Sequence, residues 1–326
     1  MSQFHFQQLT PDLMLDALAG VGLYPDTGLL ALNSYENRVY QFRNETGERL
    51  VVKFYRPERW TAEQIREEHA LAAFLADEEV PVAVPLSHDG DTLHRHGDYW
   101  FALWPSLGGR HLEPDNLDQL EAVGHQLGRW HAAASRFCLT KRPRLDPRQS
   151  LPLALAQLEE YAPWPAGLAT QLRPLLARLV RQVTEGWHAE WTPLALHGDC
   201  HLGNILWRDG PLFVDLDDCL EGPAIQDLWL LLSGDRAEQR LQLDTLLAGY
   251  EEFAEFDHRQ LALIEPLRTQ RQIQHLAWLA RRWADPAFPV AFPWFATEAF
   301  WLQQLQQLAE QERALAAPPI SLTFGL

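Results

Sequence analysis

Short apolar runs separated by polar turns make up the first third of the chain. The turns at residues 44–47 and 88–91 are rich in the Asn, Asp and Gly residues that favour reversals of the backbone. Alternation of this kind is typical of an antiparallel sheet with short strands. The pattern predicts strands at residues 29–32, 39–43, 50–55 and 99–104.

A helical pattern interrupts these strands between residues 61 and 79. Apolar side chains recur there at helical spacing from Ile65 to Leu75. Thr61 and Gln64 have the spacing of a capping box, which begins a helix, and the prolines at 81 and 85 prevent its continuation. We therefore expect one helix to cross the strands of the small sheet.

Helical spacing dominates the chain after residue 110. Apolar positions three and four residues apart recur at residues 118–137, 152–161, 168–189, 237–256, 260–284 and 297–315. The exception is the stretch 194–218, where polar loops separate short apolar strands at 194–196, 205–207 and 212–214. The pattern predicts an α+β protein with a small sheet region followed by a mostly helical region.

Composition and charge narrow the range of partners. The chain has 326 residues, 47% hydrophobic and 22% charged, so we expect a folded protein of about two domains. Lys and Arg number 27 and Asp and Glu number 44, which gives a net charge of −17. A field of this sign repels nucleic-acid phosphates and excludes nucleic acid as the main partner. Any phosphate bound here needs a local positive charge or a metal ion.

Neither a membrane nor a disulfide framework is expected. No run approaches the ~18 consecutive apolar residues of a membrane span, and the first residues lack the basic and apolar regions of a signal peptide. We therefore expect a cytoplasmic protein. Cys138, Cys200 and Cys219 are too few and too far apart for a disulfide framework or a structural zinc site, so we expect reduced thiols. Cys200 and Cys219 flank the two key acids, and we expect both to be inert because no cation is visible near them in the sequence.

The strongest chemical signal is the loop from His197 to Asn204, which reads His-Gly-Asp-Cys-His-Leu-Gly-Asn. Asp199 lies in this loop, and Asp215 leaves a short strand eleven positions after Asn204. Phosphoryl transfer needs a carboxylate that orients and deprotonates the incoming hydroxyl, and oxygen ligands for Mg²⁺. The order predicts transfer to a hydroxyl with Asp199 as the base. Asn204 and Asp215 are the predicted metal ligands, and Asp215 counts as a catalytic residue as well.

This loop resembles that of the protein kinase superfamily, in the aminoglycoside phosphotransferase and choline kinase branch, where it reads HGDxxxxN. Further blocks resemble a family of bacterial, stress-related serine/threonine protein kinases, at residues 32–40, 51–57, 196–211 and 281–286. The resemblance spans nearly the whole chain. It implies a bilobal fold with a nucleotide-binding lobe at residues 1–104, a hinge at 105–110 and a mostly helical catalytic lobe at 111–326.

The resemblance also implies the chemistry. ATP would be the phosphoryl donor, Mg²⁺ the cofactor, and Ser or Thr hydroxyls of proteins, including the kinase itself, the acceptors. We expect a monomer. The alternative is a small-molecule phosphotransferase for an amino alcohol or an aminoglycoside, whose cationic substrates suit the acidic chain. A third hypothesis, an inactive kinase-like binding module, is weakened because Lys53, Asp199, Asn204 and Asp215 are all present.

Lys53 and a glutamate on the following helix form the expected nucleotide contact. Lys53 lies within an apolar strand, where a charge is costly unless it is paired. The resemblance implies that it contacts the ATP phosphates and pairs with Glu67 or Glu68. Glu68 precedes Leu71 and Leu75 by three and seven residues, which places it on the apolar face of the helix and favours it as the partner.

The predicted phosphate loop departs from the kinase pattern. No glycine occurs between residues 29 and 40, and the sequence from Asn33 to Arg38 takes the place of the glycine-rich loop. Asn tolerates left-handed turns, and a hydroxyl or backbone N–H groups can still bind phosphate. We therefore expect Ser34 to contact the nucleotide.

The interval between Asp215 and Asp227 is a second departure. It contains no Ser, Thr or Tyr, which excludes switching by phosphorylation of this segment. Asp217 is expected either to assist the metal or substrate, or to be a solvated acid in a turn. Asp227 is expected to cap a helix or to brace the catalytic loop. We expect His197 to brace that loop as well, and His201 to be an ordinary loop residue.

Overall fold

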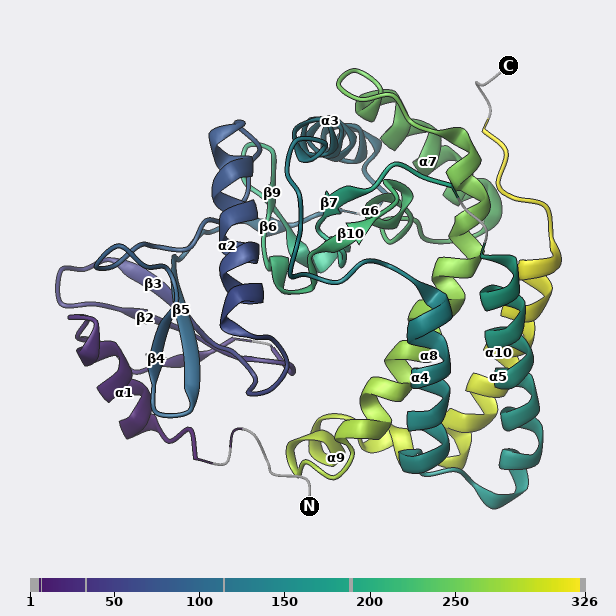
Figure 1. Cartoon of the computed structure of the whole chain (residues 1–326), viewed down its shortest axis with the longest axis horizontal. Helices are drawn as coiled ribbons and strands as arrows, with labels where there is room; N and C mark the ends of the chain where they lie inside the picture. The colour runs from purple at the N-terminus through teal and green to yellow at the C-terminus, as the bar shows by residue number, and fades with distance from the viewer. Residues whose placement is uncertain (1–5, 7, 33, 114, 188–189, 323–326) are drawn as a thin grey trace. The chain divides into compact units, whose positions relative to one another are not determined.

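The computed structural model describes residues 6, 8–32, 34–113, 115–187 and 190–322 (Figure 1). Within this part, the chain forms two compact units. The first, which we call the sheet unit, comprises residues 6–144 and 193–256. The second, the helical unit, comprises residues 145–192 and 257–322. No helix in the described ranges is long and apolar enough to cross a membrane.

A five-stranded antiparallel sheet occupies the first part of the sheet unit. Its strand order is β1-β2-β3-β5-β4. The strands are β1 (Leu30–Ala31), β2 (Arg38–Arg43), β3 (Arg49–Phe54), β4 (His94–His96) and β5 (Tyr99–Pro105). The predicted strands are confirmed. Edge strand β4 has no apolar run, so the hydrophobic pattern did not predict it.

Two helices lie on this sheet. Helix α1 (Pro11–Gly20), which was not predicted, packs Met14 and Leu18 against Val52 and Phe101 of the sheet. Burial of each such side chain contributes about 1.5–3 kcal/mol. Helix α2 (Ala62–Asp77) has the predicted capping box formed by the residue before it and Gln64. Side chains alternate along a strand, so residues 51 and 53 of β3 face away from the cluster that contains Val52.

The remainder of the sheet unit consists of helices and short strands. Its helices are α3 (Leu117–Ala134), α6 (Ile225–Trp229) and α7 (Arg236–Tyr250). The paired strands are β7 (Leu194–Leu196) with β10 (Leu220–Gly222), and β8 (Ile205–Trp207) with β6 (Arg110–His111) and β9 (Pro211–Phe213). Gly124 and Gly128 let α3 approach α7 closely, since a Cβ at either would lie under 2.5 Å from a carbonyl oxygen.

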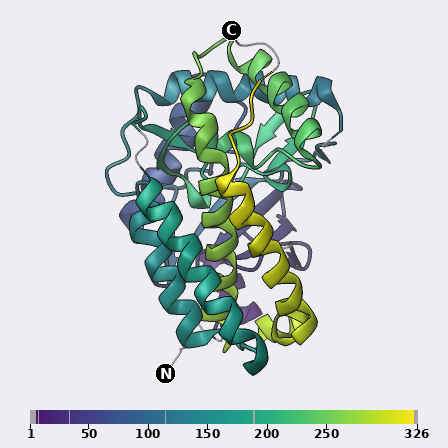
Figure 2. The same cartoon turned by 90° about the vertical axis from the view of Figure 1, so that its right-hand side faces the viewer.

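Long helices that lie side by side form the helical unit (Figure 2). They are α4 (Pro147–Tyr161), α5 (Ala166–Gly186), α8 (Ile264–Arg282) and α10 (Glu298–Ala316), with the short α9 (Ala287–Ala291). Their core contains leucines and the fully buried aromatic side chains of Phe288, Phe295 and Trp301. Helix α4 begins earlier than predicted because Asp146 caps it and Pro147 is favourable in a first turn.

Candidate active site

Lys53 is the centre of a buried group of charges. Its side chain is only 6% exposed, and its Nζ lies 2.7 Å from Asp215 Oδ1, 3.3 Å from Asp217 Oδ1 and 3.9 Å from Glu68 Oε1. Burial alone would lower the pKa of Lys53, but the three carboxylates outweigh it and raise the pKa. The lysine therefore stays protonated, as a residue that binds phosphate must.

The two adjacent glutamates of α2 have different partners. Glu68 is buried beside Lys53, and burial raises its pKa to about 7. Glu67 instead accepts hydrogen bonds from the backbone N–H groups of Thr140, Lys141 and Arg142. The structure thus brings Glu68 to Lys53, as the apolar periodicity of the helix indicated.

A cavity of about 320 Å³ opens beside this lysine. Of the predicted site residues, it is lined by Ser34, Lys53, Glu68, Asn204 and Asp215. Its other walls are largely apolar and include Leu32, Val39, Val51, Ala83, Trp104, Leu107 and Leu206. A few polar groups in an apolar wall are typical of a small-molecule site. Asn33, the first residue of the predicted phosphate loop, lies outside the described residues.

Asp227 and His197 determine the shape of the catalytic loop. The backbone N–H groups of His197 and Gly198 donate to the Asp227 carboxylate at 2.8 and 2.9 Å. His197 Nε2 donates to the Val214 carbonyl at 3.0 Å. Gly198 has φ +82°, and a Cβ there would overlap the Asp218 carbonyl. Asp227 and His197 therefore both brace the loop. Asp227 is the third residue of α6 rather than its cap.

His201, expected to be an ordinary loop residue, lies beside Asp199. Gly203 N–H donates to His201 Nδ1 at 2.9 Å, so a neutral His201 ring carries its proton on Nε2. This Nε2 lies 3.5 Å from Asp199 Oδ2. On the other side, Asn204 Nδ2 donates to the Asp199 carbonyl at 3.0 Å. His201 is therefore placed to orient the carboxylate of the predicted base.

Asp217 is buried, which rules out the solvated acid left open by the sequence. It accepts from Asn37 Nδ2 at 3.1 Å and lies 2.9 Å from Arg59 Nη1. Burial would raise the pKa of Asp217, but Lys53, Arg59 and Arg142 outweigh it and lower the pKa. Asn37 and Arg59 were missed because neither their spacing nor their type differs from that of ordinary loop residues.

Asn204 and Asp215 are suited to a divalent cation. The Asp215 side chain is 50% exposed, and Asn204 directs its Nδ2 to a carbonyl, so its oxygen is the atom that would bind a cation. Within the described ranges, no three His, Cys, Asp or Glu side chains form a metal site on their own. Phosphate oxygens would therefore have to complete the coordination, as they commonly do for Mg²⁺.

The two buried cysteines are protected thiols. Burial raises the pKa of Cys200 well above its ordinary value, and that of Cys219 to about 12. The expectation that no cation lies nearby is wrong for Cys219, because Arg142 Nε donates to its Sγ at 3.0 Å. Burial outweighs this charge, so the thiol stays protonated.

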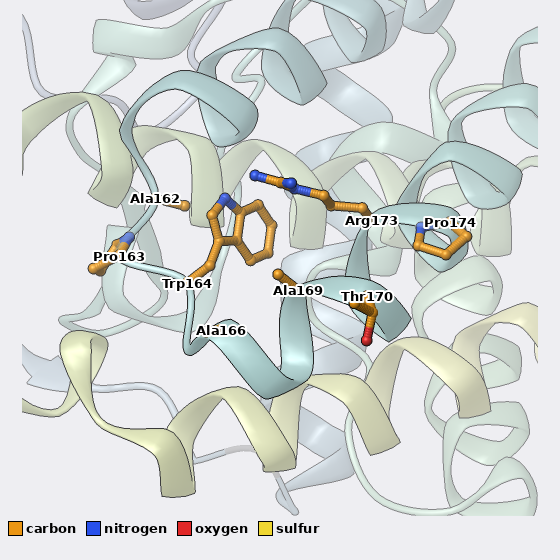
Figure 3. Close-up of a pocket in the computed structure, with 8 residues that line it drawn as sticks. All are labelled: Ala162, Pro163, Trp164, Ala166, Ala169, Thr170, Arg173 and Pro174. Atoms are coloured by element: carbon orange, nitrogen blue, oxygen red, sulfur yellow. The ribbon is translucent and has the colours of Figure 1, made fainter.

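A second hollow, of about 800 Å³, lies in the helical unit (Figure 3). Figure 3 shows Trp164, Ala169, Thr170 and Arg173 around it. The Arg173 guanidinium pairs with Glu159 at 2.8 Å. None of the predicted catalytic or metal-binding residues lines this hollow.

Comparison of sequences assigns the class of protein. The sequence model of the phosphotransferase enzyme family matches residues 28–264, more than half of the chain. The chain belongs to this family. The predicted class of enzyme, an ATP-dependent phosphotransferase, is thereby confirmed.

Two relatives narrow the assignment further. Stress response kinase A of Escherichia coli O157:H7 is 53% identical over 322 residues, 99% of this chain and 98% of the relative. The serine/threonine protein kinase RdoA of Salmonella typhimurium is 52% identical over 320 residues, 98% of each chain. The resemblance to bacterial stress-related kinases, which four blocks of sequence indicated, is confirmed over almost the full chain.

Solved structures confirm the fold. Amicoumacin kinase hAmiN, in complex with AMP-PNP and Ca²⁺, matches with a TM-score of 0.74 at 21% identity, over 97% of this chain and 96% of that one. A microcompartment-associated aminopropanol kinase matches with a TM-score of 0.70 at 19% identity, over 96% and 99%. The predicted α+β, kinase-like fold is therefore correct.

Proposed function

We propose that the chain is an ATP- and Mg²⁺-dependent serine/threonine protein kinase of a stress response, and that it phosphorylates itself. The main support for the proposal is the hydrogen bond of 2.7 Å from Lys53 Nζ to Asp215 Oδ1. Both residues line a cavity together with Ser34 and Asn204. The relative named as a serine/threonine protein kinase supports a protein acceptor.

We assign the site residues the following roles in this reaction. Asp199 orients the acceptor hydroxyl and takes its proton as the oxygen attacks the γ-phosphorus and the bond to ADP breaks. Lys53, fixed by Glu68, binds the phosphates of ATP, and Ser34 lies over them. Asn204 and Asp215 would hold Mg²⁺, which supplies positive charge to the phosphates when it is bound.

A small-molecule acceptor is the second candidate. The solved structures that share the fold include kinases of amicoumacin and of aminopropanol, and their acceptors are small molecules. The net charge of −17 would also attract a cationic alcohol. Fold similarity at this identity does not specify the acceptor, so this candidate ranks below the protein kinase.

Incubation with labelled ATP and Mg²⁺ distinguishes the two candidates. We expect label on Ser or Thr of the protein itself and of a generic basic protein, identified by phosphoamino-acid analysis. Asp199→Ala is the blank, and Asp209→Asn, which changes an exposed acid between Asn204 and Asp215, is its matched control. Rapid ATP consumption with an amino alcohol or an aminoglycoside, and no labelled protein, would favour the second candidate.

The organisation around this site is also proposed. The nucleotide-binding lobe would end near residue 104 and the hinge would cover residues 105–110. We further propose a cytoplasmic monomer. Light scattering at micromolar concentration tests the monomer, since a dimer would double the mass of 37.4 kDa.

A further inference from the structure

A short segment at residues 140–144, which we call the strap, connects two parts of the candidate site. At α2, the Glu67 carboxylate accepts from the backbone N–H groups of Thr140 at 2.6 Å, Lys141 at 2.8 Å and Arg142 at 2.6 Å. Hydrogen bonds of N–H groups to a carboxylate are among the strong ones in proteins. The backbone of the strap is therefore anchored to the helix that carries Glu68.

The side chain of Arg142 extends from the strap to the segment that follows Asp215. Its Nη2 donates to the carbonyls of Leu216 at 3.2 Å and Asp217 at 2.5 Å, and its Nε donates to Cys219 Sγ at 3.0 Å. The same Nη2 lies 3.6 Å from Glu68 Oε2.

This guanidinium is deeply buried. Its side chain is 0% exposed, and its Cζ lies 4.2 Å from the centroid of the Trp60 ring. A buried charge is costly unless its partners are well placed. Nε and Nη2 of Arg142 have partners, which are Cys219 Sγ, two backbone carbonyls and the Glu68 carboxylate, and these partners lie at or next to the candidate site.

The contacts coincide with an unusual backbone conformation at Asp215. This residue has φ +61°, the left-handed region that a non-glycine residue rarely adopts. Such conformations persist where the surroundings determine them. The Val214 carbonyl, before Asp215, accepts from His197, and the Leu216 carbonyl, after it, accepts from Arg142. Asp215 is thus held from both sides.

We propose that Arg142 is a positioning residue for phosphoryl transfer, which acts through Glu68 and through the backbone around Asp215. The inference rests on the proposed function and deepens it. The interval from Asp215 to Asp227 has no Ser, Thr or Tyr, so no phosphate attached there can order it. Instead, the Arg142 guanidinium fixes this interval by hydrogen bonds, and the site is assembled without an activating modification.

Three substitutions test this role. Arg142→Met removes the charge and the donors, and Arg142→Lys keeps the charge but loses the forked geometry. Glu67→Gln weakens the anchor of the strap without changing a residue at the cavity. Lys141→Met is the matched control, because it removes an exposed cation from the same strap and leaves the backbone in place.

The first measurement is hydrogen exchange of the wild type and the variants without metal or nucleotide. We expect faster exchange at residues 214–221 in Arg142→Met, where Glu221 N–H donates to the Pro143 carbonyl. The second is the Mg²⁺ concentration for half-maximal phosphotransfer, which should rise about 10–100-fold, the usual effect of losing a residue that orients a ligand. Arg142→Lys should recover part of the loss, and Glu67→Gln should show a smaller change in the same direction.

Wild-type exchange and Mg²⁺ dependence in both Arg142→Met and Glu67→Gln would overturn the inference. The inference would also be overturned if Lys141→Met changed hydrogen exchange and Mg²⁺ dependence as much as Arg142→Met does. If Arg142→Met does not fold, Glu67→Gln alone decides between these outcomes. Failure of the wild type to transfer phosphate would contradict the proposed function, whereas an active wild type with unaffected variants contradicts only the role of Arg142.

Discussion

Both units have an apolar core, but the sheet unit also buries a group of charged side chains. The sheet unit encloses Lys53, Glu68, Arg142, Asp217 and Asp227, each at most 6% exposed. The core of the helical unit is a continuous cluster of aliphatic and aromatic side chains. Burial of an apolar side chain is favourable by itself, whereas burial of a charge needs compensating partners. A charge stays buried only where groups of opposite charge or hydrogen-bonding groups surround it.

Because of this difference, we expect the apolar core of the helical unit to contribute mainly to stability, and the buried charges of the sheet unit mainly to activity. In the helical unit each buried side chain contributes through the apolar area that it removes from water. In the sheet unit the buried charges hold one another in fixed positions, which suits a site that must bind phosphates without rearranging. Substitutions in the two units should therefore change different measurements.

Asp199→Ala should have the largest effect on activity. Loss of the base that orients the hydroxyl should lower the rate of phosphotransfer by ~10²–10⁴-fold, because general base catalysis contributes about that much. The melting temperature should stay within a few degrees of the wild type, since the Asp199 side chain is not part of a core cluster. Retained wild-type turnover would remove Asp199 from the mechanism.

Trp301→Ala should produce the opposite result. The indole is fully buried in the helical unit, and its removal should lower the free energy of unfolding by about 3–5 kcal/mol. Leu302→Ala, at a position 45% exposed on the same helix, should cost much less. Urea unfolding measures both. A turnover number per folded molecule that falls with Trp301→Ala would contradict the separation of stability from activity.

Asn204→Ala and Asp215→Ala should change the metal requirement. Each removes one oxygen ligand, so the Mg²⁺ concentration for half-maximal activity should rise about tenfold or more, or activity should be lost. Titration of phosphotransfer with Mg²⁺ provides the measurement. Normal activity that saturates at the wild-type Mg²⁺ concentration in both variants would show that the metal assignment is wrong.

The effect of His69 on stability should depend on pH. Burial, with the charge of Lys53, lowers its pKa to about 3, and its ring nitrogens contact Tyr55 and Thr92. Between about pH 6.5 and pH 3, the unfolded chain binds a proton at this histidine that the folded protein does not. The free energy of unfolding should therefore fall as the pH falls through this range, by at most ~1.4 kcal/mol per pH unit from this group.

Comparison with His69→Gln isolates this contribution from that of the carboxylates. The variant should show a flatter pH dependence of the unfolding free energy, while His111→Gln, at an exposed position, should follow the wild type. Parallel curves for His69→Gln and the wild type would show that His69 is not held neutral by burial.

The fold was largely predictable because its elements have strong periodic patterns. The strands and the long helices are confirmed, and Glu68 was favoured over Glu67 by helical periodicity alone. Elements without a pattern were missed. Strand β4 has the sequence His-Arg-His, which contains no apolar residue. Helix α1 has only a short apolar face, and this was not recognised as a helical pattern.

Site residues that follow one another at a fixed spacing in the sequence could be predicted. Those that reach the site only through tertiary contacts could not. Asp199, Asn204 and Asp215 lie in a recognisable order along one segment. Arg59 and Arg142 are distant in sequence from the acids that they contact, and an isolated arginine has no signal of its own. His201 was visible in the loop, but its proximity to Asp199 depends on the hydrogen bond from Gly203.

We infer that the charges around Lys53 form an active site that needs no activating modification. The most direct test is the progress curve of phosphatase-treated protein, mixed at time zero with labelled ATP, Mg²⁺ and a basic protein, with Asp199→Ala as the blank. We predict that transfer to the basic protein is linear from the first turnover. A lag that disappears after preincubation with ATP would contradict it.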